Sequence, residues 1–405
     1  MTRGRAAGGS LLITGIIVLA FNLRSMITGV PPVFPELEAV LHVSSGSLAV
    51  LAAVPVLCFG AFSGAGAPLA RRYGEERVLA ASLILIALGL VLRAAAPTVL
   101  LFPGTIVAGA GIALMNVLLP SLVKRRAPDR AGLLIGLYLL ALSGGAIVAA
   151  VLAVPVFNAA GGGLAAARLV LGLWAGPAVI AVFVWAPQLR YRTRPEGGAR
   201  TGVLALRRSA LAWQVTFYMG LQSLSYYAAL SWFPTMFRDR GASAAYAGTL
   251  LALMNVGNAI TALAVPVLAH RFGDQRSLAT ASVLVTAAGL AGAGYGPNGL
   301  APAFILLLGL GQGASLGLGI YFTMARAPDP VVAASLSAFA QGIGYLIASI
   351  GPLLVGFLHT ATGGWSVPVA ALLAIAVLQL ITGWLAGRAM TVPAGRELSP
   401  AGPGG

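Results

Sequence analysis

Residues 11–35 read LLITGIIVLAFNLRSMITGVPPVFP, and this stretch decides the fold class. Its 25 residues contain no acid and a single base, Arg24. A helix needs about 20 mostly apolar residues to cross a bilayer. Arg3 and Arg5 precede the stretch, but it has no convincing signal-peptide cleavage site. We therefore interpret residues 11–35 as a first membrane span.

Eleven further apolar runs follow the first one. Of the 405 residues, 59% are hydrophobic and only 9% are charged, whereas a soluble domain has about a quarter of its residues charged. The runs are too long and too uniformly apolar for the alternating strands of a β-barrel. The sequence predicts an all-α membrane protein of twelve transmembrane helices, at 11–35, 47–70, 78–96, 98–122, 131–156, 165–187, 209–237, 244–269, 277–295, 300–324, 331–357 and 364–387.

The basic residues predict the orientation. With both termini inside, the inner segments hold 20 of the 25 lysines and arginines, the outer loops and helix ends hold 4, and Arg24 is the last. Inner loops of membrane proteins carry such an excess. The net charge of +15 is therefore interpreted as loop charge at a membrane surface, and nucleic acid is not an expected partner. We expect a multi-pass protein with both termini in the cytoplasm.

Three motif pairs recur 199 or 200 residues apart and predict an internal repeat. They are RAPD at 126–129 and 326–329, LARRYG at 69–74 against LAHRFG at 268–273, and GxG at 109–111 and 309–311. Two parallel six-helix halves are the plan of major facilitator transporters. We predict bundles at residues 1–187 and 209–390, a basic cytoplasmic linker at 188–208, and a flexible tail at 391–405.

The repeated polar motifs fall in short loops on the predicted cytoplasmic side. The resemblance to major facilitator transporters implies that such loop motifs act in gating between the two halves. The candidate gating residues are Arg71, Arg72, Gly74, Glu75, Arg126, Asp129, Arg271, Gly273, Arg326 and Asp329.

Arg24 is the residue that most strongly indicates a binding site. It lies about fourteen residues into the first span, near mid-membrane at 1.5 Å per residue. A charge at this depth costs at least about 2.5 kcal/mol and normally faces a cavity or a partner. All ten acidic residues lie in loops or at span ends, so no carboxylate is deep enough to neutralise it. A guanidinium fork suits a small planar anion, although backbone carbonyls or snorkelling could also satisfy it.

Other polar residues inside the spans are candidates for the same site. Each one can either contact a solute or join two helices by hydrogen bonds. Together with Arg24, the predicted substrate-binding residues are Asn22, Asn116, Tyr138, Gln222, Tyr226, Gln312, Gln341 and Tyr345.

The absence of deep acids also bears on energy coupling. Proton relays use intramembrane Asp, Glu or His, and the three histidines here all lie near loops. Anion exchange, uniport and proton co-transport with the solute all remain open, with Glu36 as the fallback proton carrier. The sequence has no metal-ligand cluster, catalytic constellation or phosphate loop. We expect neither an enzyme nor a cofactor.

Several segments resemble one branch of the major facilitator superfamily, the cyanate permease and 2-nitroimidazole transporter family. They are Asn22-Leu23-Arg24, TGVPP at 28–32, PVLCFG at 55–60, VKRR at 123–126, GLY at 136–138, SWFP at 231–234, GAS at 241–243, LLALM at 250–254 and QGIGY at 341–345. The resemblance implies a secondary transporter in a bacterial inner membrane that moves small, often anionic, nitrogen-bearing solutes, with Arg24 at the family's first-span arginine. We expect a monomer surrounded by lipid.

One departure and two competing interpretations remain. The superfamily usually has an aspartate before the loop arginine that follows the second span, whereas this chain has Arg71 there and His270 in the second half. Glu75 and Glu76 are candidate substitutes for that charge. A multidrug or organic-cation exporter would need a buried acid, and a membrane receptor or enzyme would need a soluble domain or a catalytic cluster. The sequence shows none of these features.

Overall fold

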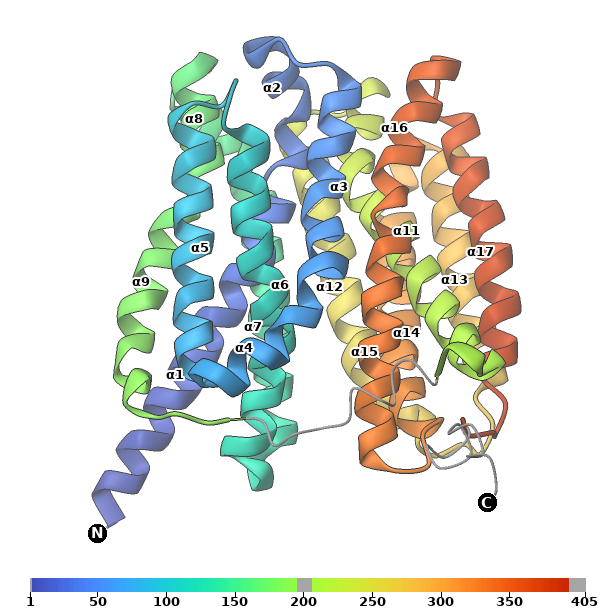
Figure 1. Cartoon of the computed structure of the whole chain (residues 1–405). Helices are drawn as coiled ribbons and strands as arrows, with labels where there is room; N and C mark the ends of the chain where they lie inside the picture. Colours follow the sequence, from blue (N-terminus) through green and yellow to red (C-terminus); the bar gives the residue numbers. More distant parts are fainter. Residues whose placement is uncertain (1, 195–205, 393–405) are drawn as a thin grey trace, which may run out of the picture.

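A computed structural model describes residues 2–194 and 206–392, with the side chains of residues 2–10 and 131 left aside. These residues form α-helices and short 3₁₀ turns with no strand among them (Figure 1). Residues 195–205 of the predicted linker and 393–405 of the predicted tail lie outside the described part. The domain boundaries stay predictions, although Val392, inside the predicted tail, is buried at 1% exposure.

The helices of the first half occupy one side of the molecule in Figure 1. They are α1 (Thr2–Thr28), η1 (Pro31–Val33), α2 (Phe34–Leu41), α3 (Ser45–Phe62), η2 (Ser63–Ala65), α4 (Gly66–Tyr73), α5 (Glu75–Ala95), α6 (Leu101–Arg126), η3 (Pro128–Arg130), α7 (Ala131–Ala159), α8 (Gly163–Gly172), α9 (Ala175–Trp185) and η4 (Ala186–Arg190).

The helices of the second half lie beside them. They are η5 (Leu206–Arg208), α11 (Ala210–Asp239), α12 (Ala244–Ala269), α13 (Arg276–Tyr295), η6 (Asn298–Leu300), α14 (Ala301–Ala325), α15 (Pro330–Ala348), α16 (Ile350–Thr362) and α17 (Ser366–Ala386).

Eleven described segments are long and apolar enough to span a membrane. The remaining predicted span, at residues 209–237, corresponds to α11, which has 30 residues and so extends about 45 Å. It is less apolar because it carries Gln222, Tyr226 and Tyr227, and neighbouring helices bury most of its length. Apolar side chains on the outer faces of other helices are open, such as Phe183 at 73% and Phe357 at 71% exposure. These faces suit lipid.

Four predicted single spans are interrupted in the structure: η1 and η2 divide residues 11–35 and 47–70, and two later spans are each broken into two α-helices. Residues 165–187 divide into α8 and α9, and residues 331–357 divide into α15 and α16. Each of these two later breaks lies next to the residue four positions before a proline, which is Leu173 before Pro177 and Ala348 before Pro352. Proline has no backbone N–H to donate to the carbonyl four residues earlier, so the helix is weakest there.

Glycines allow the helices of each half to pack closely. A Cβ on Gly111 would lie 2.5 Å from the Ser82 carbonyl oxygen, and one on Gly311 would lie 2.4 Å from the Thr286 nitrogen. The same repeat position therefore brings α6 against α5 and α14 against α13. At Gly111 and Gly311 the repeated GxG motif therefore serves close helix packing.

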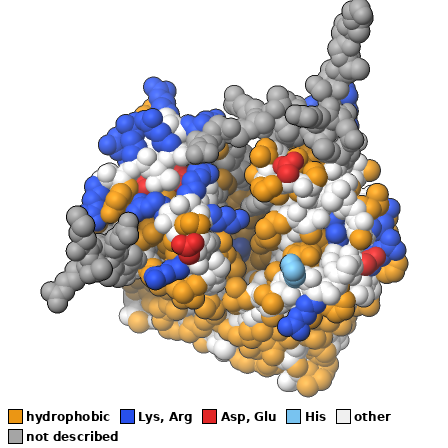
Figure 2. Space-filling model, turned by 90° about the horizontal axis from the view of Figure 1, so that it is seen from below, with side chains coloured by type: hydrophobic (Ala, Val, Ile, Leu, Met, Phe, Trp, Pro, Cys, Tyr) orange, Lys and Arg blue, Asp and Glu red, His pale blue; other side chains and the backbone are white. Residues whose placement is uncertain are grey.

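The two halves meet at the upper face in Figure 1, where α1 leads into η1 and α2. There Phe34 packs edge-on against Trp232, with ring centroids 5.9 Å apart. A Cβ on Gly248 would lie 2.7 Å from the Ala150 carbonyl oxygen, so α12 and α7 also approach closely. From the lower face, which carries the α6–α7 and α14–α15 loops, the molecule is hollowed between the halves (Figure 2).

Candidate functional site

Arg24 meets aromatic rings of the opposite half. Its guanidinium carbon lies 5.3 Å from the Tyr226 ring centroid and 5.5 Å from that of Tyr227. Both tyrosines are on α11, so this contact joins α1 to the first helix of the second half. Cation–π contacts of this kind offset part of the cost of a deep charge. We call Arg24, Tyr226, Tyr227, Tyr345 and Phe59 the central site.

Aromatic side chains from three helices complete the central site. Phe59 of α3 packs edge-on against Tyr345 of α15, at 5.4 Å between ring centroids, and against Tyr227 at 6.4 Å. Tyr345 also lies close enough to Arg24 to interact with its charge. The site is therefore a cation surrounded by aromatic walls from both halves.

Two groups of the central site have hydrogen-bond donors to spare. Among the described residues, the Arg24 guanidinium forms no ion pair and the Tyr226 hydroxyl is its polar neighbour, so most of its donors have no protein partner. The Tyr227 hydroxyl is likewise buried without a protein partner there. Tyr226 differs, because its hydroxyl donates to Asn255 Oδ1 at 2.8 Å. Arg24 is half-buried, and spare donors at a partly accessible site are the chemistry that a small anion needs.

Tyr138 and Asn116 border this site. The Tyr138 hydroxyl lies 3.4 Å from Asn116 Oδ1, which links α7 to α6. Tyr138 is close enough to Arg24 to interact with its charge. These two predicted residues therefore lie next to the central site.

Asn22, another predicted binding residue, is used in helix packing. Asn22 is buried, and its amide donates to the carbonyls of Val18, at 2.8 Å, and Pro177, at 3.4 Å. Side chains two positions apart on a helix do not share a face, so Asn22 points toward α9 while Arg24 points toward α11. A solute-binding role for Asn22 stays untested, but its position does not favour one.

Gln222 and Gln312 satisfy each other inside the second half. Gln222 Nε2 donates to Gln312 Oε1 at 3.0 Å, and Gln312 Nε2 donates to Ser225 Oγ at 3.0 Å. Both glutamines are buried, and their hydrogen bonds join α11 to α14. Gln341 is half-buried on α15, where its amide donates to Ser337 Oγ at 2.8 Å.

Sequence reasoning did not select Tyr227, Phe59 or Asn255 for the site. Tyr227 and Asn255 are polar groups within apolar spans, and that signal applied to them as much as to Tyr226. Phe59 has no distinguishing signal, because one phenylalanine in an apolar run resembles any other. The contacts across the two halves identify it.

Two candidate gating residues of the first half, Glu75 and Arg126, belong to an ion-pair cluster on the lower face. Arg125 donates to Glu75 at 2.8 Å, and Arg126 donates to Glu76 at 3.0 Å. Thr193 also donates to Glu76 through its backbone nitrogen at 2.8 Å and its hydroxyl at 2.5 Å. Glu75 and Glu76 therefore hold α5 to α6 within the first half, and not to Arg71 or to the second half.

The remaining motif residues of the first half have backbone roles. Gly74 has φ +92°, a conformation that favours glycine, and connects α4 to α5. The Arg72 carbonyl accepts from Arg192 Nη2 at 3.2 Å, and Arg71 lies in the last turn of α4. Asp129 lies in the 3₁₀ turn before α7.

The second half uses the same motif differently. Arg326 is 4% exposed and donates to the Ala386 and Gly387 carbonyls and to Gln275 Oε1. Asp329 caps α15 by accepting from the backbone nitrogens of Val331 and Val332. Arg271 and Gly273 lie in the turn between α12 and α13.

Glu36 lies at the upper face, away from the central site. It accepts from Arg238 at 2.7 Å, an ion pair that joins α2 of the first half to α11 of the second. Arg238 also donates to the Pro32 carbonyl at 3.3 Å. This position suits a contact that holds the upper face closed.

The sequence pattern of the Major Facilitator Superfamily matches residues 13–352. The chain belongs to the Major Facilitator Superfamily. It is 37% identical to the 2-nitroimidazole transporter of Escherichia coli, over 93% of this chain and 95% of that one. It is 31% identical to the cyanate transport protein CynX of the same species, over 86% and 90%. The uncharacterized transporter YycB of Bacillus subtilis is 38% identical over 93% of both chains.

Solved structures agree with this fold. A bacterial homologue of the lysosomal transporter Spinster, in an inward-facing and occupied conformation, superposes with a TM-score of 0.76 over 94% of this chain and 96% of that one. A D-xylose–proton symporter superposes at 0.69, over 94% and 98%. At 15% and 16% identity these likenesses show the fold alone. The chain is therefore a major facilitator transporter of small solutes and not an enzyme.

Proposed function

We propose that this transporter moves a small anionic or strongly electronegative, nitrogen-bearing solute across the bacterial cytoplasmic membrane by alternating access. The observation that carries the proposal is Arg24, a deep guanidinium with spare donors at the seam of the two halves. Solute bound there contacts both halves, so it stabilises the arrangements in which they close around it.

The aromatic walls support two solute shapes. A short linear anion such as cyanate accepts from Arg24 and from the Tyr227 hydroxyl. A flat ring such as 2-nitroimidazole places its nitro oxygens at Arg24 and its ring against Phe59, Tyr227 or Tyr345. Ring stacking of this kind contributes about 0.5–1.5 kcal/mol beyond simple burial. The relatives named for a cyanate and a nitroimidazole agree with these two shapes.

The charge distribution supports the orientation. Lys124, Arg125 and Arg126 end α6, and Arg71 and Arg72 end α4, all on the lower face. We assign this basic face to the cytoplasm. With the hollow between the halves on that side (Figure 2), the arrangement corresponds to a cytoplasm-facing state. One copy of the chain contains the whole central site, which supports a monomer as the working unit.

The test is solute uptake into proteoliposomes. Cyanate, nitrate, acetate and 2-nitroimidazole are each offered to the parent protein, Arg24→Ala and Arg24→Lys. Arg168→Ala is the matched control, because Arg168 is an exposed arginine on α8 and its loss changes the net charge equally.

We expect saturable uptake of cyanate or 2-nitroimidazole by the parent and by Arg168→Ala. Arg24→Ala should lose this uptake, and Arg24→Lys should recover little, because an ammonium lacks the planar fork. If Arg24→Ala is monodisperse and transports like the parent, Arg24 is structural and the anion proposal is wrong.

A further inference from the structure

A second arginine, Arg93, is buried outside the central site, in the last turn of α5. It is on α5, is 1% exposed, and forms no ion pair with a described carboxylate. Its Nε donates to the Leu171 carbonyl of α8 at 2.8 Å. Its Nη2 is buried and has no hydrogen-bond partner among the described residues. An uncompensated buried guanidinium costs several kcal/mol, so this arrangement requires an explanation.

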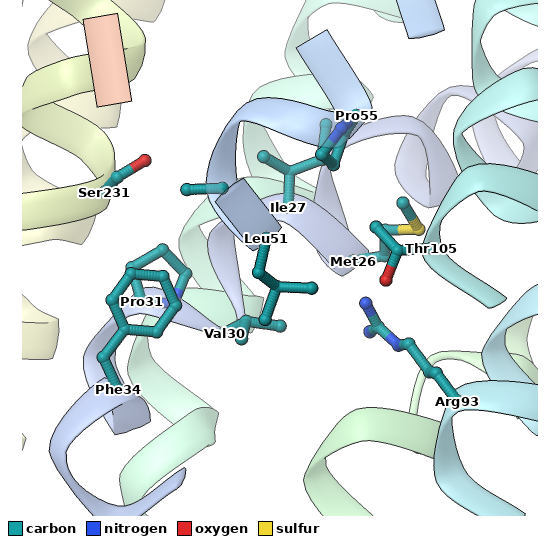
Figure 3. A pocket seen from close by; sticks show the side chains of 11 residues that line it. Met26, Ile27, Val30, Pro31, Phe34, Leu51, Pro55, Arg93, Thr105 and Ser231 are labelled. Atoms are coloured by element: carbon teal, nitrogen blue, oxygen red, sulfur yellow. The ribbon is translucent and has the colours of Figure 1, made fainter. Parts of the chain in front are cut away.

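Arg93 borders a narrow cavity with room for only a small ion or a water molecule. Figure 3 shows its guanidinium pointing toward Thr105 and Met26. Ile27 also lines this cavity and lies three residues beyond Arg24, so the cavity begins about one helical turn above the central site. Ser231 of α11 belongs to the lining as well, which places the cavity at the seam between the halves.

The free hydrogen-bond donor among the side chains that line this cavity is the Arg93 guanidinium. The hydroxyls of Thr105 and Ser231 already donate to the carbonyls of Leu101, at 2.6 Å, and Tyr227, at 2.7 Å. Most other lining residues are apolar, such as Leu51 and Val30. A guanidinium in apolar surroundings suits a weakly hydrated monovalent anion, since such an ion loses little on leaving water and a guanidinium is itself weakly hydrated.

Arg326 shows what a purely structural arginine looks like in this fold. It is also buried, and its Nε also donates to a carbonyl of the last span of its half, Ala386. Its Nη2, however, is satisfied by Gln275 and by the Gly387 carbonyl. The second half thus provides protein partners for its buried arginine, whereas the Arg93 guanidinium borders a cavity and its Nη2 has no partner among the described residues.

We propose that Arg93 forms a second anion site, above the central site, for a small weakly hydrated monovalent anion. When the upper face opens, Ser231 separates from the first half, and the cavity joins the path between the central site and the outside. Arg93 then holds the anion one step before or after Arg24. The anion class rests on the proposed function, but the presence of the site does not.

The test is the stoichiometry of thiocyanate binding to the purified full-length protein, by equilibrium dialysis in detergent. We expect two thiocyanate ions per parent chain, one in Arg24→Gln and one in Arg93→Gln. Arg326→Gln is the matched control and should keep two. Loss of the Arg93 donors should weaken that site at least about tenfold.

The outcomes separate the two sites. One ion in the parent and none in Arg24→Gln overturns the second site and leaves the central site standing. One ion in both the parent and Arg24→Gln, but none in Arg93→Gln, supports the second site and contradicts the central one.

A crystal soak keeps the proposal testable if Arg93→Gln does not fold. Crystals of the parent soaked in bromide should show an anomalous peak within hydrogen-bond distance of Arg93 Nη2. A well-ordered Arg93 without such a peak, in crystals that bind bromide elsewhere, overturns the proposal.

Discussion

The two halves share a fold but contribute different chemistry to the central site. The first half supplies the charge, Arg24, and the 200-residue repeat places Leu224 at the corresponding position of the second half. The second half supplies the neutral groups Tyr226, Tyr227 and Tyr345. A repeat can therefore preserve helix packing while it divides the work of binding. Because one half carries the cation, an anion bound there is held mainly by the first half.

The lower face shows the same division. Arg126 and Arg326 are 200 residues apart, and Glu76 and Gln275 are 199 apart, so the two pairs are equivalent by the repeat. In the first half the pair is ionic, at 3.0 Å between Arg126 and Glu76. In the second half Arg326 meets the neutral Gln275. At the central site and at this lower-face pair, the first half therefore relies more on charged groups than the second half does.

The largest expected effect comes from breaking the ionic pair of the lower face. Glu76→Ala should destabilise the protein by about 3–5 kcal/mol, because Arg126 and two Thr193 donors lose a buried acceptor. Gln275→Ala should cost about 1–3 kcal/mol, since a neutral acceptor is lost. Thermal unfolding in detergent measures both, and equal shifts in Tm would contradict the asymmetry.

A smaller effect is expected in the neutral wall of the central site. Tyr227→Phe removes a hydroxyl that has no protein partner among the described residues, so solute affinity should fall about fivefold while Tm changes little. Tyr226→Phe is the matched control, because its hydroxyl already donates to Asn255. It should lower Tm more than affinity. Solute titration and thermal unfolding of both variants check this, and the reverse pattern would refute it.

The smallest effect concerns the contact between the halves at the upper face. Arg238→Gln weakens the pair with Glu36, which is partly exposed and contributes about 0.2–1 kcal/mol. The population with the upper face open should rise by up to about fivefold. Labelling of a cysteine introduced near Ser231 measures the opening. An unchanged labelling rate would mean that apolar contacts such as Phe34 with Trp232 hold this face alone.

The fold could be predicted from the sequence, and Arg24 could be proposed as a binding residue, but most of the aromatic residues around it could not. Long apolar runs, the arginine bias and the repeat predicted the helices, because membrane insertion constrains composition directly. Arg24 stood out because a deep charge is rare. Gln222 and Gln312 were predicted at the site, yet they bond to each other, and a sequence does not state which span faces which. Pro177 and Pro352 indicate helix breaks in the sequence, but those breaks were not predicted.

The position of Asn22 around the helix axis explains why its side chain lies apart from that of Arg24. Asn22 was grouped with Arg24 because the two are close in sequence, yet two positions on a helix separate their faces. Tyr227 follows Tyr226 directly, and both rings still reach Arg24, because that side chain is long and lies over the two of them. Contacts made by such a long side chain cannot be inferred from sequence spacing alone.

The central claim is that the charge in the first half binds the solute. The most direct measurement is the initial rate of cyanate uptake into proteoliposomes by Arg24→Leu, which makes position 24 identical to its repeat equivalent Leu224. The account predicts a folded protein with uptake reduced at least about a hundredfold, as expected when two hydrogen bonds to a charged group are lost. A folded Arg24→Leu protein with uptake within twofold of the parent would contradict it.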